Sequence, residues 1–150
     1  MGRHGRVDRF RADKVMSADS ANALLRRLEG YDLVIASVHG TSYKLEKEFG
    51  VPQLTLDFLR RLGDRQRLTF VLFANPYRLV QAYGAHRWAA VVCAYEETED
   101  SQDLVAQALF GGIPAPGSLP VTASSLFTPA SRLLNTTGIL RYSLPEVLPA

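Results

Sequence analysis

The chain has 150 residues, 47% of them hydrophobic and 21% charged, which is the size and composition of one ordinary globular domain. Its formal net charge of +2 is too small to predict a nucleic-acid partner, and its single cysteine excludes an internal disulfide framework. No apolar run approaches the roughly 20 residues that a membrane span needs, so we expect no membrane partner.

The first third of the chain predicts an edge strand, a helix and a buried strand. Residues 7–15 alternate weakly between apolar and polar side chains, which favours a strand at the edge of a sheet. Residues 17–29 predict a helix, because Ser17 or Asp19 can cap its start and leucines recur at helical spacing. Residues 31–38 form a nearly continuous apolar run, which is typical of a parallel strand covered on both faces.

The middle of the chain predicts a helix, a second buried strand and a short helix. Residues 53–62 have helical periodicity, and the side chains that we expect to face inward are Leu54, Phe58, Leu59 and Leu62. Residues 68–74 predict the buried strand. Asn75 is a favourable N-cap and Pro76 fits the first helical position, so a short helix is expected as far as residue 83.

The last part of the chain predicts one more strand and helix, followed by an irregular tail. Residues 88–95 form the third buried strand. Residues 101–110 predict a helix that an aspartate or serine caps at its start, with four inward side chains, Leu104, Val105, Ala108 and Leu109. Residues 119–150 are expected to pack on the domain as a tail, in which residues 139–143 could add an antiparallel edge strand.

Three buried strands that alternate with helices predict an α/β fold, a three-layer α/β/α sandwich with a mostly parallel sheet. Ligands of such sheets bind outside the carboxyl ends of the strands. The polar loops 39–42, 75–77 and 95–100 each follow a predicted strand, so we expect them to line one edge together. The candidate ligand-binding residues of this rim are His39, Thr41, Asn75, Tyr95, Glu96 and Glu97.

The rim residues do not form a complete catalytic motif. Ser37 lies near His39 but not in a G-x-S-x-G turn, so the sequence does not predict it as a nucleophile. The histidines and Cys93 lack the spacing of metal ligands, so no metal site is predicted. His39 could be a structural turn residue or a base. The acidic cluster that contains Glu97 could complement a helix dipole or contact sugar hydroxyls.

The rim tyrosine and a glycine-rich segment each allow two interpretations. Tyr95 could cap the core with its hydroxyl in water, or its ring could stack on a sugar. Gly112 and Gly117 have the glycine spacing of a phosphate-binding loop, but Ser118 stands where that loop requires lysine, and the segment follows a predicted helix where the motif follows a strand. We therefore expect no cofactor at that segment.

Four segments carry a resemblance to a known family. Residues 109–122, LFGGIPAPGSLPVT, resemble the LFG-x-x-x-P-x-G-x-LP-x-T signature near the end of the C-terminal α/β domain of glycoside hydrolase family 3. YDLVIASVHGTS, VLFANPY and AYEETE precede it in the expected order. Asn-Pro-Tyr in the second of these segments and Tyr-Glu-Glu in the third make the chain similar to the second domain of family 3 β-N-acetylhexosaminidases, including those fused to a serine β-lactamase-like domain.

The resemblance implies an accessory domain of a retaining glycosidase that acts on terminal β-linked sugars. In such enzymes the nucleophilic aspartate lies on a preceding (β/α)8 barrel, and in the hexosaminidase branch a histidine-containing loop of that barrel supplies the acid/base. In the β-glucosidase branch a glutamate after the first strand of the second domain is the acid, and here only Glu46 and Glu48 could correspond to it. The chain lacks the barrel motifs, so we expect it to be inactive alone.

The implied partners are the barrel domain and a carbohydrate at the shared cleft, and no cofactor is implied. The location is unknown: it would be the bacterial periplasm or the exterior if the parent enzyme carries a signal peptide, and residues 1–6 lack the apolar core of one. Two other classes of protein stay open. A free-standing nucleotide- or flavin-binding domain needs a phosphate-cradling loop, which only residues 39–42 approach, and a structural docking module needs an exposed apolar patch.

Overall fold

The computed structural model describes residues 7–129 and has an α/β fold with a three-stranded, all-parallel sheet. The strands are β1 (Val34–Val38), β2 (Leu68–Leu72) and β3 (Ala90–Cys93), paired in that order. Val34 pairs with Leu68, and Thr69 pairs with Ala90. The predicted parallel sheet is confirmed, and each strand is shorter than its apolar run: β1 begins later, β2 ends earlier, and β3 is shorter at both ends.

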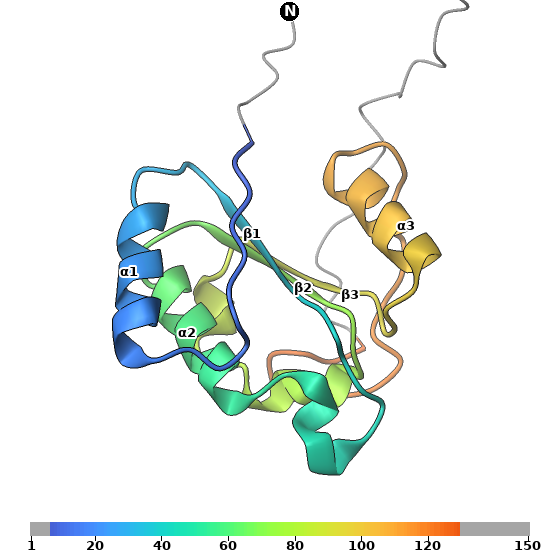
Figure 1. Cartoon of the computed structure of the whole chain (residues 1–150). Coiled ribbons are helices and arrows are strands. Elements are labelled where there is room, and N and C mark those ends of the chain that lie inside the picture. Colours follow the sequence, from blue (N-terminus) through green and yellow to red (C-terminus); the bar gives the residue numbers. More distant parts are fainter. Residues whose placement is uncertain (1–6, 130–150) are drawn as a thin grey trace, which may run out of the picture.

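Helices flank the sheet as the alternation of segments predicts. Figure 1 shows α1 (Ala18–Leu28) and α2 (Gln53–Gly63) on one side of the sheet and α3 (Glu99–Leu109) on the other. The Ser17 side chain accepts a hydrogen bond from the Ser20 N–H at 3.2 Å, which confirms the predicted cap of α1. Short 3-10 helices fill the connections: η1 (Leu45–Gly50), η2 (Pro76–Gln81) and η3 (Ala85–Arg87).

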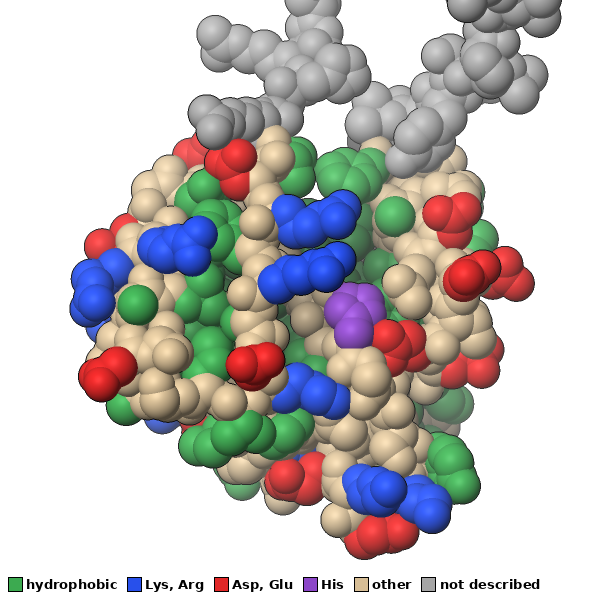
Figure 2. All heavy atoms as spheres, viewed as in Figure 1, with side chains coloured by type: hydrophobic (Ala, Val, Ile, Leu, Met, Phe, Trp, Pro, Cys, Tyr) green, Lys and Arg blue, Asp and Glu red, His purple; other side chains and the backbone are tan. Residues whose placement is uncertain are grey.

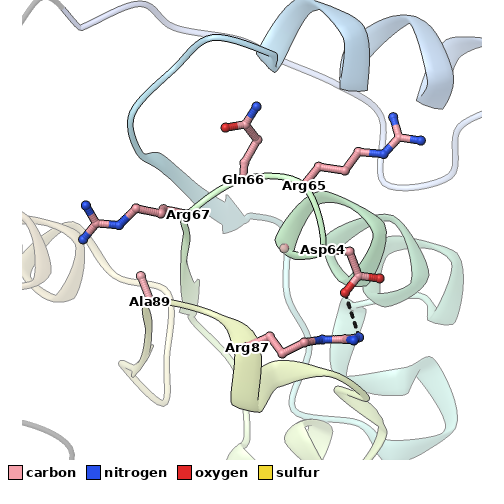
Figure 3. Close-up of a pocket in the computed structure, with 7 residues that line it drawn as sticks. Asp64, Arg65, Gln66, Arg67, Arg87 and Ala89 are labelled. Carbon is pink, nitrogen blue, oxygen red and sulfur yellow. Dashed lines mark ion pairs between the residues drawn. The ribbon is translucent and has the colours of Figure 1, made fainter.

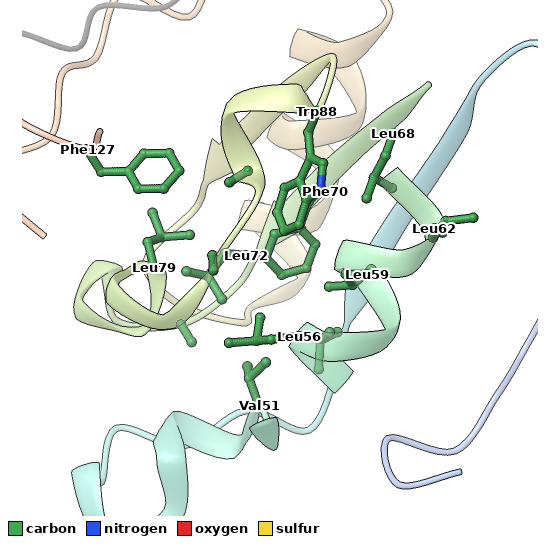
Figure 4. Packing of buried hydrophobic residues seen from close by; sticks show 14 of the residues in the cluster. Val51, Leu56, Leu59, Leu62, Leu68, Phe70, Leu72, Leu79, Trp88 and Phe127 are labelled. Atoms are coloured by element: carbon green, nitrogen blue, oxygen red, sulfur yellow. The ribbon is translucent and has the colours of Figure 1, made fainter. Parts of the chain in front are cut away.

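The core lies between the sheet and the helices of the α1/α2 side. Every residue of the central strand β2 is buried, and Phe70 is fully enclosed. The Trp88 ring contacts the Phe70 ring edge-on, with the ring centroids 5.7 Å apart. Figure 4 shows this pair between α2 and the segment after β2, with Phe127 at the side of the same cluster. Residue 127 therefore ties part of the segment after α3 to the core.

The structure corrects the prediction of an edge strand at residues 7–15. This segment has no regular secondary structure. Its contacts go to helices and loops instead of a neighbouring strand: the Lys14 carbonyl accepts a hydrogen bond from Thr55 Oγ1 at 2.6 Å, and the Phe10 ring packs edge-on against Tyr31. Only Phe10 and Lys14 of this segment are partly buried, and Val7 and Val15 are 80% and 59% exposed, so the alternation does not mark a buried strand face.

Two helix faces also differ from those predicted. In α2 Leu54 is 56% exposed, although helical periodicity predicts that it faces inward. The buried face of the helix instead consists of Thr55, Leu56, Leu59 and Leu62. In α3 no residue is buried and Leu104 is 53% exposed, since this helix covers the sheet only partly. Thr98 caps α3, so the prediction of Asp100 or Ser101 as its cap is wrong.

The connection after β2 is a 3-10 helix that begins at Pro76 and ends at Gln81, shorter than predicted. Asn75 caps it as expected, because its side chain accepts a hydrogen bond from the Tyr77 N–H at 3.0 Å. The predicted strand at residues 139–143 lies outside the described residues. So does the predicted tail beyond residue 129.

Candidate functional site

The three parallel strands end at one edge, where side chains from distant segments form a hydrogen-bonded network. His39 Nδ1 lies 2.9 Å from Glu97 Oε1, although the two residues are 58 positions apart. The Thr41 N–H donates to Glu97 Oε2 at 3.0 Å, and Thr41 Oγ1 donates to the Phe73 carbonyl at 2.7 Å. The network therefore joins the end of β1, the end of β2 and the loop after β3.

The carboxyl group of Glu97 is ionised in this setting. Burial raises its pKa, but the hydrogen bonds from the Thr41 N–H and from His39, together with the charge that His39 carries when it is protonated, outweigh this effect and hold the pKa below its ordinary value. An ionised carboxylate can only accept hydrogen bonds. His39 Nδ1 therefore carries the proton that Glu97 accepts, which leaves Nε2 as an acceptor when the ring is neutral.

Ser37 completes this chain of hydrogen bonds. Its Oγ lies 2.8 Å from His39 Nε2, and both residues are exposed, with 50% of the His39 side chain open to solvent. Because the two residues are two positions apart along the strand direction, their side chains lie on one face. The sequence does not predict Ser37 as a nucleophile, because Ser37 is not in a G-x-S-x-G turn, but the structure places it in line with a histidine and a carboxylate.

The loop after β3 places Glu97 by an unusual backbone conformation. Tyr95 has φ +66°, a left-handed value, and the Glu96 N–H donates to the Ala94 carbonyl at 2.8 Å. The chain then reaches Thr98, which caps α3. The reversal turns the side chain of Glu97 back over the end of β2 towards β1, and it leaves Tyr95 44% exposed. Burial raises the pKa of the Tyr95 hydroxyl, and the neighbouring Cys93 adds to that shift.

The structure brings together three of the six rim candidates, His39, Thr41 and Glu97. Asn75 is engaged in capping η2, and Glu96 is exposed. Figure 2 shows a histidine beside an acidic side chain near the middle of the face in view, with basic side chains next to it. The Thr41 N–H, which a phosphate would need in a cradle, is bound by a carboxylate, and this disfavours a phosphate at loop 39–42.

The two glutamates considered as acids lie in η1, and neither hydrogen-bonds to His39, Thr41 or Glu97 among the described contacts. Glu46 is exposed. Glu48 Oε1 lies 3.3 Å from the Arg78 guanidinium, whose side chain is only 5% exposed. Burial lowers the pKa of Arg78, and Glu48 offsets part of that effect. A groove of about 400 Å³ passes this ion pair and is lined by Leu45, Glu48, Phe49, Tyr77, Arg78, Val80 and Gln81.

A second hollow, of about 480 Å³, lies at the opposite, amino end of the strands. Arg65, Arg67 and Arg87 line it, and Figure 3 shows their guanidinium groups pointing in different directions. Arg87 is already paired with Asp64 at 2.7 Å. The arginines thus do not converge on one point, as they would around a bound anion.

The described residues 7–129 do not support a reactive cysteine, a metal site or a membrane-spanning helix. Burial raises the pKa of the Cys93 thiol to about 11, so this group is protonated and unreactive at neutral pH. Within that range no three histidine, cysteine or acidic residues gather as metal ligands. None of the helices described there is long and apolar enough to span a membrane.

Replacing Glu97 with glutamine tests the network through its pH dependence. Because the folded-state pKa of Glu97 lies below its ordinary value, the stabilisation by its carboxylate is present at neutral pH and is lost as the pH falls through the folded-state pKa. We expect Glu97→Gln to lower the free energy of unfolding by about 1–2 kcal/mol at pH 7 and by much less at pH 3. Urea unfolding at both pH values measures the difference.

The exposed neighbour Glu96 provides the matched control, and Glu96→Gln should change stability by less than about 0.5 kcal/mol at either pH. Equal losses for the two variants would show that the network contributes nothing to the fold.

Comparisons of the chain with protein-family models, with curated proteins and with solved structures found no match.

Proposed function

We propose that this chain is the accessory α/β domain of a retaining family 3 glycosidase of the β-N-acetylhexosaminidase type, and that its carboxyl-edge loops form part of the active-site rim. The observation that carries the proposal is the placement of the motif residues. His39 and Thr41 belong to YDLVIASVHGTS and Glu97 belongs to AYEETE, and these residues hydrogen-bond to one another. VLFANPY contributes the Phe73 carbonyl between them.

The chemistry of the edge suits binding and positioning of a sugar better than acid catalysis. Retaining hydrolysis needs two groups that flank the glycosidic bond, about 5 Å apart in the usual two-carboxylate case. Glu97 is held ionised, which makes it a poor general acid, and Glu48 is paired with Arg78. The domain therefore supplies hydrogen-bonding groups, and the barrel supplies the reacting ones.

The rim also offers aromatic surface of the kind that sugars contact. The side chains of Tyr77 and Tyr95, which follow β2 and β3, are 50% and 44% exposed. An aromatic ring with a polar hydroxyl can pack against the apolar face of a sugar and hydrogen-bond to its edge.

Exposed apolar side chains on β1 and near α3 provide a surface on which a partner barrel could pack. The outward-facing Ile35 of β1 is 43% exposed, although β2 beside it is buried on both faces. On α3, Leu104 and the following Phe110 are 53% and 51% exposed. Apolar side chains in these positions favour a neighbouring domain over open solvent.

Activity assays with and without a barrel test the proposal. We expect the 150-residue chain to show no turnover of p-nitrophenyl N-acetyl-β-glucosaminide. A separately produced family 3 barrel domain from the same organism should bind the chain in analytical ultracentrifugation and hydrolyse the substrate faster in its presence.

Variants at the rim should separate docking from rim function. Thr41→Val is expected to reduce the gain in turnover without preventing the complex, whereas Arg26→Ala, on the exposed side of α1, should change neither. Robust turnover by the chain alone, or no association with the barrel, would overturn the proposal.

A further inference from the structure

We propose that Ser37, His39 and Glu97 form a relay that activates the Ser37 hydroxyl as a nucleophile towards acyl esters. Ser37 Oγ lies 2.8 Å from His39 Nε2, and His39 Nδ1 lies 2.9 Å from Glu97 Oε1. Nucleophile, base and orienting carboxylate thus follow one another within hydrogen-bonding distance, which is the geometry by which such sites are recognised on unrelated folds. The inference does not depend on the glycosidase role.

The proton positions required for this chemistry follow from the charge on Glu97. The ionised carboxylate accepts the Nδ1 proton of His39, so the neutral ring presents its Nε2 lone pair to Ser37. Ser37 Oγ must then donate its own proton along the 2.8 Å contact. This is the tautomer that a general base needs, and Glu97 would stabilise the imidazolium that forms when His39 takes the proton.

The three side chains are held by rigid elements. Ser37 lies within β1, paired in register with Val71 of the buried central strand. The His39 ring packs against the Phe73 ring, with the ring centroids 5.5 Å apart. The second oxygen of Glu97 is held by the Thr41 N–H, so the carboxylate cannot rotate without losing that bond. Ser37 and the His39 ring are exposed, so an ester can approach them from solvent.

The reaction balances without any oxidant, reductant or metal. Ser37 Oγ attacks the carbonyl carbon of the ester while its proton moves to His39 Nε2. The bond from carbon to the leaving alcohol breaks, and the alcohol takes the proton from Nε2, which leaves an acyl group on Ser37. Water then attacks the acyl group, with His39 again as base, and releases the carboxylic acid and free Ser37.

A fluorophosphonate probe reports on an activated serine directly. Its phosphorus forms a bond to the serine oxygen and fluoride leaves, so one adduct per chain is expected, mapped to Ser37 by peptide mass spectrometry. The same chain should hydrolyse p-nitrophenyl acetate with a burst of p-nitrophenol. Ser37→Ala should abolish both signals.

Two further variants separate activation from mere exposure. Glu97→Gln should slow labelling of Ser37 at least about tenfold, because the carboxylate no longer fixes the His39 tautomer that acts as base, and general-base assistance typically contributes two or more orders of magnitude. Ser118→Ala, at an exposed serine in the segment after α3, should leave labelling unchanged. Circular dichroism and urea midpoints confirm that each variant is folded. The labelling rate of Ser37 is measured under conditions in which the least stable variant is still folded.

The relay is overturned if the probe labels Ser37 no faster than other exposed serines. It is also overturned if folded Glu97→Gln is labelled at the rate of the unmodified chain. These results would leave the association with a barrel untouched, so the two proposals fail independently.

Discussion

Replacing Gly50 with alanine is expected to lower the free energy of unfolding by about 3 kcal/mol, through backbone strain and a steric clash together. Gly50 has φ +76°, a value that residues with a Cβ adopt only at a cost. An added Cβ would lie 2.6 Å from the Thr41 Cα and 2.8 Å from the Ser42 nitrogen. These are backbone atoms, so they cannot move aside as a flexible side chain would.

The clash occurs at the loop that positions the rim. The Ser42 N–H donates to the Phe49 carbonyl at 3.0 Å, and Lys14 Nζ donates to the Gly50 carbonyl at 2.9 Å. A shift of this loop would carry Thr41 away from Glu97. We therefore expect Gly50→Ala to reduce the labelling of Ser37 as well as stability.

Two other glycines separate the contributions to this effect. Gly30 has φ +93° but no atom within 4 Å of an added Cβ, so Gly30→Ala should show the strain alone, about 1–2 kcal/mol. Gly117 also has open space and no such φ, so Gly117→Ala should be nearly neutral. Urea unfolding of the three variants tests the order, and a Gly50 variant no weaker than the Gly30 variant would contradict the argument.

The sequence predicted those features that local patterns determine. The continuous apolar runs at β1, β2 and β3 predict neighbouring parallel strands, and the structure pairs them in parallel. The predicted cover on both faces is correct for β2 alone: Ile35 and Ser37 of β1 are exposed and no residue of β3 is buried, because α3 covers its side of the sheet only partly. Cap residues also predicted local geometry, as Ser17 and Asn75 show. Because the carboxyl ends of parallel strands meet at one edge, the loops containing His39 and Glu97 could be expected to lie together.

The sequence could not predict contacts that depend on side-chain reach. No motif near Ser37 indicates that the His39 ring lies between Ser37 and Glu97, which is 58 positions beyond His39. The left-handed conformation of Tyr95 turns Glu97 back over the sheet. It could not be predicted, because the residue that usually indicates such a conformation is glycine and this position holds tyrosine. Helical periodicity predicts that Leu54 and Leu104 face inward, but the tertiary packing selects which helix face is covered, and both are exposed.

Arg78 is the other position where we expect a large loss of stability, because its buried side chain hydrogen-bonds to four residues and ties η2 to residues 48–53. Its Nε donates to the Val51 carbonyl at 2.7 Å, and its terminal nitrogens hydrogen-bond Glu48, Gln53 and Gln81. Arg78→Ala would leave a buried carbonyl without its partner and remove the packing of the methylene stem. We expect the free energy of unfolding to fall by about 3 kcal/mol, measured by urea unfolding at pH 7.

Comparison with Glu48→Gln decides which interaction of Arg78 matters. The Glu48 side chain is 48% exposed, so its ion pair lies in a largely aqueous setting and should contribute less than about 1 kcal/mol. If Arg78 acts mainly through the Val51 carbonyl, Glu48→Gln is nearly neutral and Arg78→Lys loses most of what Arg78→Ala loses, because a lysine amine does not reproduce the guanidinium fork. Equal losses for Glu48→Gln and Arg78→Ala would instead assign the stabilisation to the ion pair. That result would make Glu48 a residue that stabilises the fold. If Glu48→Gln instead changes the free energy of unfolding only slightly, the Glu48 carboxylate is a polar group that lines the groove beside η2.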